Sequence, residues 1–101
     1  MDRRLELHEI LATLLGSRDV YFQPPASVQM KYPCIVYSRD EKDEKFANDK
    51  LYLGKMRYSI TVIDKNPDSA IPGKVAELPL TSFSRHFTLD NLNHDIYSTC
   101  F

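Results

Sequence analysis

The chain has 101 residues, of which 43% are hydrophobic and 27% charged, and its formal net charge at pH 7 is -1. This length allows a single domain, spanning residues 1–101, and the apolar share excludes a disordered chain. Basic residues are interleaved with acidic ones, so tight binding to nucleic acid is not expected. No run approaches the ~20 apolar residues of a membrane span, and the charged start differs from a signal peptide. We therefore expect a cytosolic chain with Cys34 and Cys100 reduced.

The first predicted element is an amphipathic helix near the N-terminus. Asp2 suits its N-cap, and Gly16 stands where a left-handed C-cap glycine is common. Four apolar residues recur with helical spacing and predict its buried stripe: Leu7, Ile10, Leu11 and Leu14.

Three β-rich segments follow. Val20–Phe22 ends at Pro24 and Pro25, which cannot donate ladder hydrogen bonds, and Cys34–Ser38 is a second strand. The longest strand is predicted from Tyr52 to Asp64. It alternates Met56, Tyr58, Ile60 and Val62 with Arg57, Ser59 and Thr61. This alternation predicts a sheet with one buried face.

The last third predicts a second helix and a hairpin. Cap-forming residues and an early proline at Asn66–Ser69 indicate a helix start, with helical spacing up to Leu78. The segment 81–88 alternates Phe83, Arg85 and Phe87 with Ser84, His86 and Thr88, and Asp90–Asn91 is a turn before the strand His94–Phe101. The predicted fold is α+β: a small antiparallel sheet of about four to five strands with two helices packed on one face.

A long charged hairpin loop is predicted between the second and third strands. It carries charges of both signs and one large apolar side chain, and it exceeds the usual two to five residues of hairpin loops. It is either a solvated tip or a docking arm anchored by its aromatic residue. The candidate protein-interaction residues are Lys42, Lys45, Phe46, Asp49, Lys50 and Tyr52.

No catalytic or metal-binding motif is present: the sequence lacks a glycine-rich phosphate loop, Cys-x-x-Cys and His-Glu-x-x-His. One metal candidate combines His86, His94, Asp95 and Cys100, but its spacing matches no zinc signature, and these are ordinary strand residues. A second candidate pairs Cys34 with His8 or His86 as a nucleophile. A cysteine inside an apolar strand behaves as a small hydrophobe, however. We expect no enzyme activity, no metal and no cofactor.

Several strings from Lys31 onward resemble the tail terminator or tail-completion (head–tail joining) family of long-tailed phages and prophages. They are Lys31–Tyr37, Phe46–Asp49, Arg57–Asp64, Asn66–Ser69, Ile71–Pro72, Arg85–Phe87 and Asp90–Asp95. The resemblance implies a small antiparallel sheet flanked by helices, and a structural protein that caps the tail tube as a ring, typically a hexamer. It also implies tail tube and head–tail connector proteins as partners, and a place in the virion tail or neck after assembly in the host cytoplasm.

Two alternatives remain open. A head-side connector or adaptor protein of the neck would belong to the same virion but to another layer. A small cytosolic ligand-binding or regulatory domain would need a concave apolar pocket with convergent polar groups. A nuclease-like accessory domain is disfavoured, because the sequence has neither the acid cluster nor the positive charge. Under the resemblance, we expect the free chain to be a monomer or a weak oligomer that forms its ring on assembly.

Overall fold

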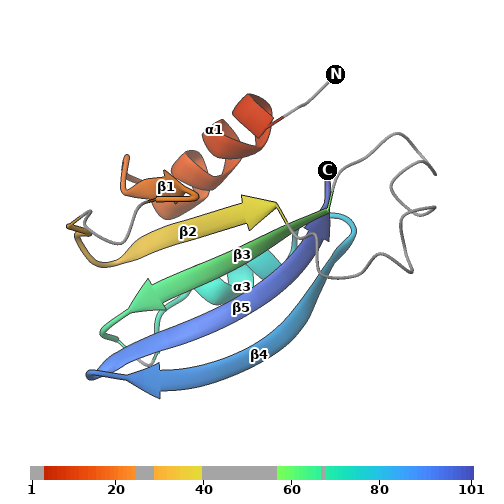
Figure 1. Ribbon diagram of the computed structural model, residues 1–101. Helices are drawn as coiled ribbons and strands as arrows, with labels where there is room; N and C mark the ends of the chain where they lie inside the picture. Colours follow the sequence, from red (N-terminus) through yellow and green to blue (C-terminus); the bar gives the residue numbers. More distant parts are fainter. Residues whose placement is uncertain (1–3, 25–28, 40–56, 67) are drawn as a thin grey trace.

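The computed structural model describes residues 4–24, 29–39, 57–66 and 68–101. Its elements, in chain order, are α1 (Arg4–Leu15), β1 (Val20–Phe22), β2 (Cys34–Arg39), β3 (Arg57–Asp64), α3 (Ile71–Ala76), β4 (Thr81–Leu89) and β5 (Leu92–Cys100) (Figure 1). Among these residues, no helix is long and apolar enough to cross a bilayer.

The strands form one five-stranded sheet in the order β1-β2-β3-β5-β4, with α1 and α3 packed on one face. The predicted α+β fold is therefore confirmed. One pairing differs from the expected antiparallel pattern, because β1 runs parallel to β2 while all other pairs are antiparallel. The chain between β1 and β2 is long enough to return to the starting end of the sheet, which a tight hairpin turn cannot do.

The core lies between the helices and alternate residues of the central strands. Tyr58, Ile60 and Val62 of β3 are fully buried, as the alternation predicted, and Tyr37 and Tyr97 flank Ile60 in the ladder. Fully burying such side chains contributes roughly 1.5–3 kcal/mol each. Met56, the fourth residue of the predicted buried face, lies outside the described residues.

The buried stripe of α1 differs from the predicted one at a single position. Leu7 and Leu11 are buried and Leu14 packs against the core, but Ile10 is 38% exposed and Ala12 is buried in its place. The helix therefore sits on the sheet with a slightly rotated face. Gly16 has φ +83° and donates its N–H to the Ala12 carbonyl (2.9 Å), which confirms the C-cap. Asp2, the predicted N-cap, lies outside the described residues.

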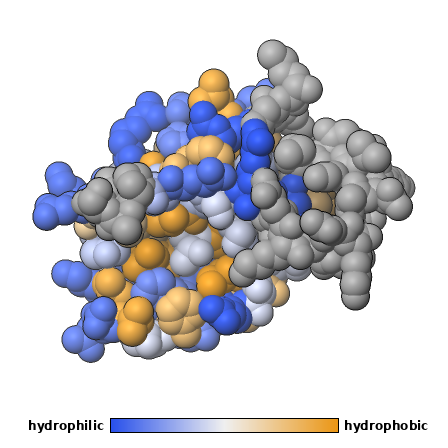
Figure 2. All heavy atoms as spheres, in the orientation of Figure 1, coloured by the Kyte–Doolittle hydropathy of each residue, from blue (hydrophilic) through white to orange (hydrophobic). Residues whose placement is uncertain are grey.

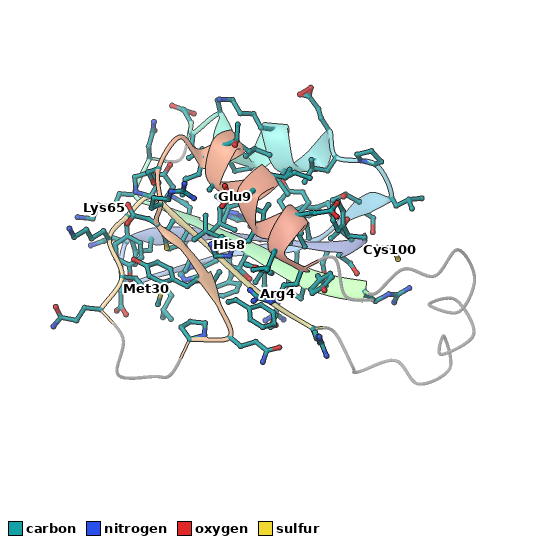
Figure 3. All side chains as sticks on the ribbon, turned by 90° about the horizontal axis from the view of Figure 1, so that it is seen from above. Arg4, His8, Glu9, Met30, Lys65 and Cys100 are labelled. Atoms are coloured by element: carbon teal, nitrogen blue, oxygen red, sulfur yellow. The ribbon has the colours of Figure 1, made fainter. Side chains whose placement is uncertain are left out.

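Polar and aromatic contacts attach α1 to β1 and β2. His8 Nδ1 lies 2.8 Å from Tyr37 Oη, and the Arg4 guanidinium lies over the Phe22 ring at 4.4 Å. Figure 3 labels Arg4 and His8 on α1, which lies in the foreground when the molecule is seen from above. Arg4 Nη1 also donates to Tyr37 Oη at 3.3 Å, so the hydroxyl of this buried tyrosine has polar partners while its ring packs in the core.

Helix α3 is shorter than the predicted segment 66–78. The Asn66 N–H is donated to Asp64 Oδ1 (3.0 Å) and the Asp68 N–H to Asn66 Oδ1 (2.9 Å), so these residues form side-chain-closed turns before the helix begins. Pro72 occupies the first turn, as expected, where its missing N–H costs nothing. The cap formers therefore shape the approach to the helix instead of starting it.

The C-terminal hairpin is confirmed, with Asp90 and Asn91 at φ +52° and +63° in its turn. β5 begins at Leu92, two residues before the predicted start. A register shift between Phe83 and Arg85 overturns the predicted alternation, because it places Phe83 beside Tyr97 on the helix face and Arg85 on the other face. A bulge adds one residue to one strand, and side chains beyond it change sides.

Candidate protein-interaction surface

The six residues nominated from the sequence are not placed by the structure. Lys42, Lys45, Phe46, Asp49, Lys50 and Tyr52 all lie in segment 40–56, outside the described residues. Their role as a docking arm remains a prediction. The described residues present a different surface, on the side of the sheet that faces away from the helices.

This open face consists of the alternate residues of β2, β3, β5 and β4 whose side chains point away from α1 and α3. Over much of the sheet the two sides of the same strands differ in burial, although Cys34 and Ile63, at one end of the open face, are buried as well. Ile35 and Ile60 on the helix face are fully buried, whereas Val36, Thr61 and Ile96 on the open face are only half-buried. Figure 2 shows this side of the molecule, where hydrophobic and weakly polar residues lie over the central strands between hydrophilic ones.

Four serines form one row across the open face. The strand register places Ser38 beside Ser59, Ser59 beside Ser98 and Ser98 beside Ser82. Ser82 is exposed and the other three are half-buried. Because serine side chains are short, this row is a shallow polar strip over which another backbone or helix can approach closely.

Apolar and aromatic side chains lie beside the serine row. The next row joins Val36, Thr61 and Ile96, and ends at Arg85 on the edge strand β4. The Arg85 guanidinium lies 5.3 Å from the centre of the Phe87 ring, and this ring stacks on His94 at 4.5 Å with an 8° interplanar angle. The two rings and the guanidinium therefore form one packed edge of the face.

The open face carries no carboxylate among the described strand residues, although it includes Arg57 and Arg85. The strand carboxylates are all on the other side. Asp64 and Asp95 belong to the helix face, and Asp95 Oδ1 lies 2.7 Å from His86 Nδ1. Among the described strand residues the carboxylates therefore lie on the helix face, together with Arg39, while the open face has Arg57 and Arg85.

Cys34 lies at one corner of this face and is fully buried. Burial, followed by the charges of Asp19 and Asp64, raises the pKa of its thiol to about 12. A thiol with this pKa stays protonated at neutral pH, and the thiolate is the nucleophilic form. His8 is bonded to Tyr37, and His86 projects from the opposite face of the sheet. The geometry gives neither proposed nucleophile pair.

The four residues of the candidate metal site are separated by the same alternation. His86 and Asp95 are on the helix face, whereas His94 and Cys100 are on the open face. Throughout the part of the chain that the structure describes, no three His, Cys, Asp or Glu side chains are grouped as metal ligands would be. The sequence spacing could not show this, because a strand places neighbouring residues on opposite sides.

A hollow of about 270 Å³ lies between α1 and the C-terminal end of β5. Its walls are mostly apolar and include Ile10, Leu78, Leu80 and Phe101. Leu80 is 55% exposed and has φ +56°, a conformation that is strained for a residue with a side chain. A small-molecule site needs a few convergent polar groups as well. Thr99, the polar residue of this lining, already pairs its hydroxyl with that of Thr81 (2.7 Å).

Comparison with known proteins adds no relative: no protein-family model, no curated protein and no solved structure matches the chain. The resemblance to phage tail proteins therefore stands on the sequence strings alone.

The open face was not predicted as a site. Its signal was the polar side of β3, where Arg57, Ser59 and Thr61 lack any acid. The bulge in β4 hid the contribution of Arg85 and Phe87.

Proposed function

We propose that this chain is a structural protein of a long-tailed phage virion, which caps the tail tube as a ring and joins the tail to the head connector. The observation that carries the proposal is the open face, a partly solvent-accessible sheet surface with apolar, aromatic and arginine side chains and no carboxylate among the described strand residues. Such a surface is suited to another protein, because aromatic residues and arginine are enriched at interfaces.

The sheet edges favour a head-to-tail assembly. One edge is β1, with three residues and Pro24 shortly after it, and the other is β4, with nine residues. A long edge strand with few charges invites contact, whereas a short one beside a proline does not. Unlike edges support contacts between two different patches, and such contacts close into rings when the rotation between subunits allows it. The expected ring has six copies.

The partners follow from the proposed position in the virion. The tail tube protein lies on one side of the ring and the head–tail connector protein on the other. Lys42, Lys45, Phe46, Asp49, Lys50 and Tyr52 remain our candidates for a docking arm to the tube or to the next subunit. We propose no catalytic residue, metal or cofactor, since protein contact alone performs this task.

The experiment is electron microscopy of a lysate from phage that lack this gene. We expect full heads beside detached tails that are overlong and variable in length, because an uncapped tube continues to grow. Detached tails of normal length would instead assign the chain to the connector layer of the neck. Intact, infectious particles would contradict the proposal and favour the ligand-binding alternative.

A further inference from the structure

The outer side of α1 has chemistry that complements the open face. Leu5 is 70% exposed and Ile10 38% exposed, and Glu6 and Glu9 lie between them on the same side of the helix. This outer stripe of α1, completed by Thr13, is apolar and acidic. The open face is largely apolar and has Arg57 and Arg85, with no carboxylate among its described strand residues.

We infer that the open face of one copy receives the outer stripe of α1 from the next copy. The inference rests on the ring assembly proposed above and adds a second contact between neighbouring copies to that of the sheet edges. Arg85 of one copy then faces Glu9 of its neighbour, while Ile96 and Phe87 cover the exposed Leu5 and Ile10. Opposite charges at a contact's rim favour one docking orientation over others.

The dimensions of the two surfaces agree. α1 has 12 residues and is therefore roughly 18 Å long at 1.5 Å per residue. The four strands of the open face, spaced about 4.8 Å apart, span roughly 14 Å between their outer axes. A single helix can thus cross the whole face. The serine row leaves room for it, since short side chains permit close approach.

The two surfaces lie on different parts of the molecule, as a head-to-tail contact requires. The open face is turned towards the viewer in Figure 2, whereas α1 lies in the foreground of Figure 3, which is seen from a quarter-turn away. The surfaces are different patches, one on the sheet and one on the helix layer. Repeating such a contact turns each copy relative to the last, and the assembly closes into a ring when this rotation allows it.

One existing contact must be exchanged when the surfaces meet. The Arg18 guanidinium donates to Glu9 Oε2 at 2.9 Å, and both side chains are largely exposed. Exposed ion pairs of this kind contribute at most about 1 kcal/mol, so Glu9 can take a second or replacement partner at little cost.

The test is a charge-exchange cycle on the full chain, measured by sedimentation equilibrium at low salt. Arg85→Glu and Glu9→Arg should each weaken self-association about three- to tenfold, because each places like charges together. The double variant should return to within about twofold of the parent, since the pair is restored with reversed signs. Lys74→Glu is the matched control, since it reverses one exposed charge on α3, outside both surfaces.

Disulfide trapping provides a second measurement that does not need a stable oligomer. In a Cys100→Ser background, Ile10→Cys and Ile96→Cys proteins should cross-link when mixed, and neither should cross-link alone. The inference would be overturned if the double variant did not recover self-association, or if Ile96→Cys cross-linked to itself. It would also be overturned if the protein showed neither association nor cross-linking at about 1 mM, because even a millimolar Kd gives measurable dimer at that concentration.

Other occupants of the face give distinguishable results. If Arg85→Glu leaves self-association unchanged but weakens binding of a labelled single-stranded oligonucleotide, the face binds nucleic acid and the inference is wrong. A normal phage phenotype on loss of the gene together with a positive cycle would refute the virion role but keep the contact. Overlong tails on loss of the gene, together with a charge-exchange cycle in which the double variant is not restored, would support the virion role and refute the contact.

Discussion

At the scale of single residues, Cys34 links the core to the pH dependence of stability. Its thiol has a pKa of about 12 in the folded chain, against an ordinary value of 9.0, because burial disfavours the thiolate. The neutral thiol therefore stabilises the fold fully below pH 9. That contribution is lost as the pH rises from 9 towards 12, because the unfolded chain releases the proton first.

We predict that the parent protein loses more stability than Cys34→Ala between pH 8 and pH 10.5, by on the order of 1 kcal/mol. The measurement is urea unfolding of both proteins at each pH. The comparison cancels other groups that titrate in this range, including Tyr97, whose pKa burial and the Asp95 charge also raise. Parallel pH profiles for the two proteins would show that the buried thiol does not contribute this dependence.

At the scale of elements, the β4–β5 hairpin depends on two residues with positive φ. Asp90 and Asn91 adopt +52° and +63°, the backbone of a type I′ turn, whose twist matches the flanking strands. Asn91→Gly should leave stability unchanged or raise it by up to about 1 kcal/mol, since glycine adopts this region freely. Asn91→Val should lower it by about 1–2 kcal/mol, because a β-branched side chain clashes there.

Urea unfolding of both Asn91 variants at one pH measures the difference. If Asn91→Val were as stable as Asn91→Gly, the turn would not have the positive-φ backbone that the structure gives it. The hairpin contributes Arg85 and Phe87 to the open face. A weakened turn is therefore also expected to weaken the contact inferred above.

The same elements show what the sequence could predict and where it stopped. Alternation along β3 was sufficient to assign its buried side, and glycine and the Asp90–Asn91 pair were sufficient to place a helix end and a turn. The grouping of Phe83 with Arg85 and Phe87 on one side of the strand was wrong, because a one-residue bulge leaves no mark in a periodic pattern. The parallel pairing of β1 was missed because strand direction depends on the path of the connection, which local sequence does not specify.

The residues of the candidate sites were also only partly predictable from the sequence. The six residues nominated from the charged loop lie outside the described residues, so their prediction stays open: Lys42, Lys45, Phe46, Asp49, Lys50 and Tyr52. The metal candidate failed because proximity along a strand does not mean proximity in space: His94 and Asp95 are consecutive but point to opposite faces. The open face depends on the register of four strands, and no single segment of the sequence contains it.

At the scale of the whole molecule, one face of the sheet packs in the core and the other is available for contact with a partner. Ile60 on the helix face is fully buried in the core, whereas Ile96, on the adjacent strand, lies half-buried on the open face. The same truncation should therefore have different consequences. Ile60→Ala should lower the free energy of unfolding by about 2–5 kcal/mol, because it leaves a cavity among packed residues. Ile96→Ala should lower it by less than about 1.5 kcal/mol, since water already reaches that side chain.

The effects of the two truncations on self-association should have the opposite order. Ile96→Ala removes apolar surface that the next copy is expected to cover, so its self-association should weaken while its unfolding curve stays close to that of the parent. Ile60→Ala lies on the far side of the sheet from this contact, so the fraction of it that remains folded should associate normally. Sedimentation and urea unfolding on the same two variants measure both quantities. Equal losses of stability would mean that both faces are core, and that contact with partners must be sought elsewhere on the chain.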